Sequence, residues 1–213
     1  MTKSNEDLRH QWLEALTPFA VAQPVAEKTF KYLVTAYSDS GRFYHNLCHI
    51  ENVLATIIRL TEYAPSPTLQ LAAWFHDAVY DSRAEDNEEQ SASLAGAMLK
   101  EMNIPGPIVE ATKHLILLTK NHVADAEDED GKILLDADLA ILGQSPDRYA
   151  AYARAIRQEY AWVPEADYRA GRSKVLAGFL KRARIYHTPV MFAACEQPAR
   201  NNLAAEMERL TSS

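Results

Sequence analysis

A histidine and an aspartate, His76 and Asp77, stand side by side in the apolar segment LQLAAWFHDAVY. We predict that this segment is a helix buried on nearly every side, with the pair at its centre. An unpaired carboxylate in such a core is strongly unfavourable, so Asp77 requires a cationic partner. An arginine, a protonated histidine or a metal ion would each meet that requirement.

Other residues favour the metal ion. His45 and His49 are four residues apart at the start of an apolar stripe that runs to Tyr63, which predicts one helix with both imidazoles on the same face. A further aspartate, Asp138, lies in the apolar run LLDADLAIL, where Asp136 is interpreted as a helix N-cap and Asp138 has no such role. Imidazole and carboxylate ligands suit manganese, iron, cobalt, nickel or zinc better than calcium.

The ordered set His49, His76-Asp77 and Asp138 resembles the HD superfamily of metal-dependent phosphohydrolases, an all-helical fold. Five segments together resemble an uncharacterised bacterial group of predicted metal-dependent HD phosphohydrolases: RFYHNLCHIENVL, FHDAVYDSRAEDNEEQSA, LLDADLAILG, EYAWVP and RAGRSKVLAGFLKRARIY. The resemblance implies that His49, His76, Asp77 and Asp138 hold the metal. It admits one or two ions, with magnesium added to the transition metals above.

The resemblance also implies a reaction class. The expected activity is hydrolysis of a phosphoester or phosphoanhydride bond in a small phosphorylated molecule, with a nucleotide as the expected substrate. Asp77 would hold the ion while orienting or deprotonating the attacking water, and Arg42 would grip a phosphate oxygen. His45 would face the substrate or support the ligand His49. Two alternatives stay open: a di-iron oxygenase on the same ligands, and a nucleotide-sensing module without turnover.

Further residues are weaker candidates. His114 and His122 are eight residues apart, and on one continuous helix they would point to similar sides, toward a second metal or the substrate. Asp81 would share a helix face with Asp77 and extend an acidic wall. The substrate-binding candidates are ordinary solvated or core residues in the alternative interpretation; they are Tyr44, Glu88, Arg172, Lys181 and Arg182.

Composition bounds the remaining possibilities. The chain has 213 residues, only 7 glycines and a net charge of −7, which favours one helical domain and disfavours binding to a nucleic acid polymer or an anionic membrane. No apolar run is long enough to cross a bilayer, and the N-terminal segment MTKSNEDLRHQ is too polar for a signal peptide. The expected setting is therefore cytoplasmic. Cys48 and Cys195 lie far apart without CxxC spacing and are expected to be reduced thiols. A monomer or a homodimer is expected.

Prolines and apolar periodicity predict an all-α fold of eight to ten helices, and the resemblance implies a compact HD-like bundle. A single all-helical domain is expected over residues 1–213, with its motif-bearing core at about 41–186. The acidic segment DAEDEDGK is expected to be a loop without calcium, because Ala137 falls where an EF-hand needs a glutamate. The predicted helices include Pro24 to Tyr37, His45 to Tyr63, Ile108 to Thr119, Pro146 to Ala161, Pro164 to Ala183 and Pro198 to Leu210.

Overall fold

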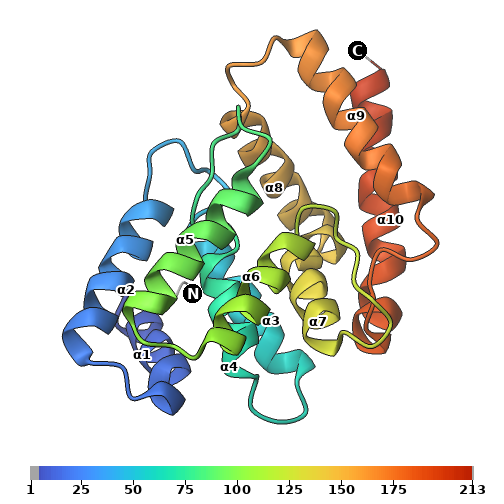
Figure 1. The fold of residues 1–213 in the computed structure, drawn as a ribbon. Helices are drawn as coiled ribbons and strands as arrows, with labels where there is room; N and C mark the ends of the chain where they lie inside the picture. Colours follow the sequence, from blue (N-terminus) through green and yellow to red (C-terminus); the bar gives the residue numbers. More distant parts are fainter. Residues whose placement is uncertain (1–4, 213) are drawn as a thin grey trace. The chain divides into compact units, whose positions relative to one another are not determined.

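The computed structural model describes residues 5–212, which are predominantly helical (Figure 1). Over this range there are ten α-helices, two 3-10 helices and no strand, which confirms the predicted all-α class. Residues 1–4 of the polar N-terminal segment lie outside the described residues, as does residue 213. The elements are α1 (Asn5–Leu16), η1 (Thr17–Phe19), α2 (Gln23–Tyr37), α3 (Leu47–Leu60), α4 (Pro67–Phe75), α5 (Asn87–Glu101), α6 (Gly106–Leu118), α7 (Glu129–Asp138), η2 (Leu139–Gly143), α8 (Pro146–Glu159), α9 (Glu165–Lys181) and α10 (Pro189–Thr211).

Backbone contacts divide the chain into two units, Met1–Ala137 and Asp138–Ser213. The first unit contains α1 to α6 and nearly all of α7, and the second contains η2 and α8 to α10. The expectation of one domain over the whole chain stays a prediction. None of the helices in residues 5–212 is long and apolar enough to cross a membrane.

Aromatic side chains join three helices within the core of the first unit. The ring of Trp12 meets those of Trp74 and Phe75 edge to face, with centroids 5.7 and 6.1 Å apart, and Phe30 meets Trp74 in the same way. The indole N–H of Trp12 donates to the carbonyl of Ala26 at 2.9 Å, so this polar group is satisfied inside the core. These contacts join α1, α2 and α4.

Local signals set where the helices begin. Pro24 lies in the first turn of α2, as predicted, and the hydroxyl of Ser66 accepts a hydrogen bond from the N–H of Leu69 at the start of α4. The prediction that a helix begins at His45 is wrong. Asn46 is in an extended conformation and its side chain caps the N–H of Cys48, so α3 begins at Leu47 and His45 precedes it.

In the second unit, α9 and α10 lie side by side (Figure 1). The guanidinium of Arg172 on α9 donates two hydrogen bonds to the carboxylate of Glu206 on α10, at 2.8 and 3.1 Å. Gly143 at the end of η2 abuts Cys195 so closely that a Cβ atom there would lie 2.6 Å from the cysteine Cβ. A side chain at position 143 would therefore separate η2 from α10.

The last helix begins earlier than predicted. Pro198 was expected to open it, whereas α10 starts at Pro189 and Pro198 lies inside it. A proline within a helix frees the carbonyl four residues earlier, here that of Ala194. Both residues are exposed, so water can satisfy that carbonyl.

Candidate metal centre

The His-Asp pair lies at the end of its helix. The prediction that His76 and Asp77 occupy a helix centre is wrong, because α4 ends at Phe75 and His76 is its C-cap. The N–H of Ala78 turns back to the carbonyl of Phe75 at 3.0 Å, which closes the turn. The pair therefore stands where a buried apolar helix meets irregular backbone, with His76 buried and Asp77 partly exposed.

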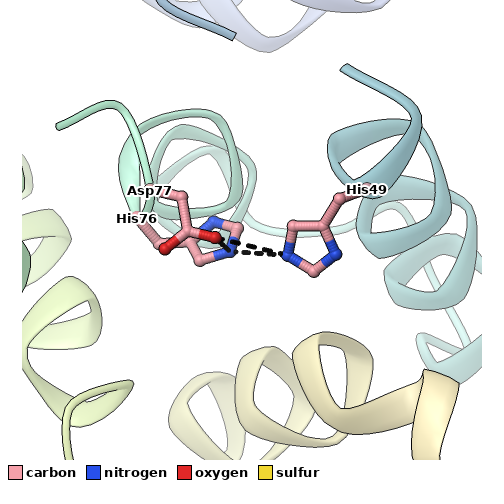
Figure 2. Close-up of side chains that lie close together, drawn as sticks. All are labelled: His49, His76 and Asp77. Atoms are coloured by element: carbon pink, nitrogen blue, oxygen red, sulfur yellow. Dashed lines mark hydrogen bonds and ion pairs between the residues drawn. The ribbon is translucent and has the colours of Figure 1, made fainter. Parts of the chain in front are cut away.

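Three ligand atoms converge at this turn. Figure 2 shows His49, from α3, facing His76 and Asp77. The Nε2 atoms of the two histidines are 3.1 Å apart, and Oδ2 of Asp77 lies 3.2 Å from His76 Nε2 and 3.5 Å from His49 Nε2. Within residues 5–212 these three side chains are the group with metal-ligand geometry.

The triangle has the dimensions that a first-row divalent ion requires. Ligand atoms at about 2.1 Å from an ion are about 3.0 Å apart at octahedral angles and about 3.4 Å apart at tetrahedral angles. The observed separations of 3.1, 3.2 and 3.5 Å fall at or near these values. A buried group of His49, His76 and Asp77 could therefore hold a metal ion, with its other coordination positions left to further ligands.

The protonation of His76 also suits a metal ligand. Its Nδ1 lies 2.9 Å from the carbonyl of Ala73, an acceptor, so Nδ1 carries the proton. In neutral His76 the Nε2 atom then presents a lone pair toward His49 and Asp77. A backbone carbonyl that fixes the imidazole in this way is a common support for a metal-binding histidine.

The carboxyl group of Asp77 is held in its charged form. Burial opposes its ionisation, but the charge and hydrogen bond that His76 supplies when its Nε2 is also protonated, with further attraction from His45 and His49, outweigh that effect and hold the pKa of Asp77 well below its usual range. A carboxylate is the form that ligates a cation.

Arg42 lies at the site but contacts the backbone. Its Nη1 donates to the carbonyls of Asp77 at 2.6 Å and His45 at 3.1 Å, and its Nη2 donates to the carbonyl of Ala78 at 3.0 Å. Its guanidinium also lies over the rings of Tyr37 and Tyr80. Arg42 thus holds the turn that carries Asp77, and its contact with a substrate phosphate stays a prediction.

Aromatic rings lie beside His49 and His45. The Tyr44 ring lies 4.9 Å from that of His49 and 5.1 Å from that of His45. His45 stacks on Tyr80 at 4.3 Å, and its ring is 5.9 Å from that of His49. Both sequence candidates, Tyr44 and His45, are thus next to the ligands.

Two side chains of α5, Asn87 and Ser91, hold the backbone segment that follows the His-Asp pair. Neither residue was assigned this role from the sequence. The hydroxyl of buried Ser91 accepts from the N–H of Val79 at 3.0 Å and donates to its carbonyl at 3.2 Å. One turn earlier, the amide of Asn87 forms a matching pair of 2.9 Å bonds with the backbone of Asp81. The i, i+4 spacing of Asn87 and Ser91 was the available signal. Asp81 lies in this non-helical segment, so the prediction that it shares a helix face with Asp77 is wrong.

The two aspartates of LLDADLAIL differ in burial, and the more buried one is the residue that was interpreted as a helix cap. Asp136 lies inside α7 and is fully buried, so its interpretation as an N-cap is wrong. Asp138 is the last residue of α7, begins the second unit and is half-buried. Its assignment as a fourth ligand stays a prediction.

The two later histidines do not share a helix. His114 is on α6, 59% exposed, and its Nε2 lies 3.1 Å from the carboxylate of Asp128. The helix ends at Leu118, and His122 follows in left-handed backbone with φ 50°. The condition of one continuous helix, under which the two side chains would point to similar sides, is therefore not met, and neither histidine belongs to the group of three.

The weaker candidates lie in varied settings. Glu88 is half-buried in the first turn of α5, and Lys181 is exposed at the end of α9. The Arg182 guanidinium lies over the ring of Phe179, and burial lowers the pKa of Arg182. Arg172 is held by Glu206.

Comparison of the chain with family models, with curated proteins and with solved structures finds no match.

Proposed function

We propose that this protein is a metal-dependent hydrolase of a phosphoester or phosphoanhydride bond in a small molecule, with a nucleotide as the favoured substrate, and that it belongs to the HD superfamily. The observation that carries the proposal is the triangle of His49 Nε2, His76 Nε2 and Asp77 Oδ2. Imidazole and carboxylate donors at this spacing suit a first-row divalent ion.

The chain's own residues divide the work. His49 and His76 would hold the ion through Nε2, and Asp77 would hold it through Oδ2 while orienting the attacking water. When bound, the ion polarises a phosphoryl oxygen and lowers the pKa of a water molecule. His45, stacked on Tyr80, is placed to exchange a proton near the ligands, and Arg42 fixes the turn that carries Asp77. Asp138 is retained from the sequence as a further ligand.

One observation favours a second candidate, an iron-dependent oxygenase. Two histidines and one carboxylate are also the ligand set of the facial triad in non-haem iron oxygenases. The two reactions differ in their need for electrons, since hydrolysis takes none from the metal. Redox-inert ions therefore support hydrolysis but not oxygenation.

The test is an anaerobic assay of protein loaded with magnesium or manganese. Phosphate or pyrophosphate release is measured across nucleotides and sugar phosphates, with His49→Ala as the inactive control and His10→Ala, an exposed histidine on α1, as the matched control. We expect that the unmodified protein and His10→Ala turn over at least one substrate and that His49→Ala turns over none. Turnover confined to iron and oxygen would favour the oxygenase, and tight nucleotide binding without turnover would favour a sensor.

A further inference from the structure

A second site lies in the unit formed by residues 138–213. Helices α8, α9 and α10 line an open cavity of about 410 Å³. Each helix contributes one arginine to its lining, namely Arg154, Arg169 and Arg209. This volume lies within the range of small-molecule sites.

The acidic residues of the cavity are already neutralised. Glu165 pairs with Arg157 at 3.0 Å, and Glu206 pairs with Arg172 at 2.8 Å. Glu206 also accepts a hydrogen bond from the hydroxyl of Tyr149. Because both carboxylates have their own cations outside the lining, the three lining arginines leave the cavity with a net positive charge.

Arg154 and Arg209 keep their N–H donors available, whereas Arg169 uses two of its donors within the chain. Arg169 donates through Nε and Nη2 to the carbonyl of Leu210, which satisfies hydrogen bonds but leaves its charge uncompensated. Within residues 5–212, Arg154 and Arg209 have no hydrogen-bond or ion-pair partner, and both are exposed. Each presents a fork of N–H donors toward a small anion.

The rest of the lining is apolar. Ala150, Ala153 and Leu210 form a wall beside the arginines. A carboxylate carries one negative charge on two oxygens, whereas a phosphate monoester carries a charge of about −1.5 to −2 on three peripheral oxygens and therefore gains more from two arginines. The apolar wall suits the organic part of such an ester.

We infer that this cavity binds a small phosphate monoester, with Arg154 and Arg209 holding the phosphate and the wall of Ala150, Ala153 and Leu210 contacting the organic group. This site goes beyond the proposed hydrolase centre and contains none of its ligands. It would serve to recognise a phosphorylated molecule without a metal ion.

Calorimetric titration with phenyl phosphate tests the inference on full-length protein stripped of metal by a chelator and then dialysed. We expect saturable binding that is weaker for benzoate. Removing one charge-assisted contact, by Arg154→Gln or Arg209→Gln, should raise the Kd about tenfold. Arg148→Gln, an exposed arginine on α8 outside the cavity, should leave the Kd unchanged.

A second variant separates shape from charge. Ala153→Leu fills the cavity and keeps every arginine, so it should also weaken binding of phenyl phosphate. The inference is wrong if the unmodified protein binds no phenyl phosphate, if benzoate binds as tightly, or if Arg148→Gln weakens binding as much as Arg154→Gln. Metal-free binding is independent of turnover, so the hydrolase proposal can fail while this one stands, and the reverse.

Discussion

Arg42 donates a 2.6 Å hydrogen bond to the backbone carbonyl of Asp77, 35 residues later in the chain. A second donor of the same guanidinium reaches the carbonyl of Ala78 at 3.0 Å. The two bonds fix the backbone on which the Asp77 carboxylate stands, so the direction of that carboxylate toward His49 and His76 depends on a residue that does not touch a ligand atom.

Arg42→Ala should therefore weaken metal binding. Supporting residues of this kind change metal affinity by about 10- to 100-fold when removed. Loss of the bonds to three carbonyls should also lower the free energy of unfolding by about 2–3 kcal/mol. Competition with a chromophoric chelator measures the first effect and chemical denaturation the second. Arg148→Ala is the control. Unchanged metal affinity in Arg42→Ala would contradict this support of the metal centre and would favour the predicted contact between Arg42 and a substrate phosphate.

Metal should stabilise the folded protein through its ligands. We expect about one to two ions per chain by elemental analysis, and an ion at 100 times its Kd adds about 2.7 kcal/mol to stability. His49→Ala and Asp77→Asn should abolish the thermal shift caused by added metal, while His10→Ala should retain it. Asp138→Ala tests the fourth ligand predicted from the sequence; full metal affinity in this variant would remove it from the site.

Metal binding should weaken as the pH falls from 7.5 to 5. An imidazole must be unprotonated at the nitrogen that binds an ion, so acid competes with a metal that has histidine ligands. The pKa of Asp77 is held well below its usual range, so its carboxylate stays charged over this interval and does not contribute to the loss. Chelator competition at several pH values measures the effect. An affinity that rises toward pH 5 would argue against histidine ligands.

Ser91→Ala should destabilise the protein by about 1–3 kcal/mol, because it leaves the N–H and carbonyl of Val79 without their shared partner. Ser93→Ala is the matched control on the same helix, since Ser93 is exposed and should change stability by less than about 0.5 kcal/mol. Denaturant titration compares the two. Equal effects would show that the Ser91 hydroxyl does not hold the segment after the His-Asp pair.

Glu206→Ala should lower the free energy of unfolding by about 3–5 kcal/mol, because it leaves the Arg172 guanidinium buried without its carboxylate. Burial first, and then the charge and hydrogen bond of Glu206, raise the pKa of Tyr149. The same variant should therefore allow Tyr149 to ionise at lower pH in the folded protein, which ultraviolet titration detects. Glu208→Ala, an exposed neighbour on α10, should do neither.

The sequence by itself determined the class of fold and pointed to the residues of the candidate metal centre. Prolines and capping side chains act on the backbone within a few residues, which is why Pro24 and Pro146 mark the helix starts that are observed. The polar pair His76-Asp77 in an apolar segment indicated a site because a charge is costly in a core wherever the chain passes. That argument needs no knowledge of the neighbours.

Only the tertiary structure decided which groups meet. The end of α4 at Phe75 and the placement of Arg42 depend on contacts between segments 35 residues apart, which no local pattern encodes. The same holds for Asp136 and Asp138, since two residues of similar local context differ in burial once helices pack around them. Local propensity sets where helices start. Packing over long sequence separations sets which of the two aspartates, Asp136 or Asp138, is fully buried, and it sets which arginine holds the turn that carries Asp77.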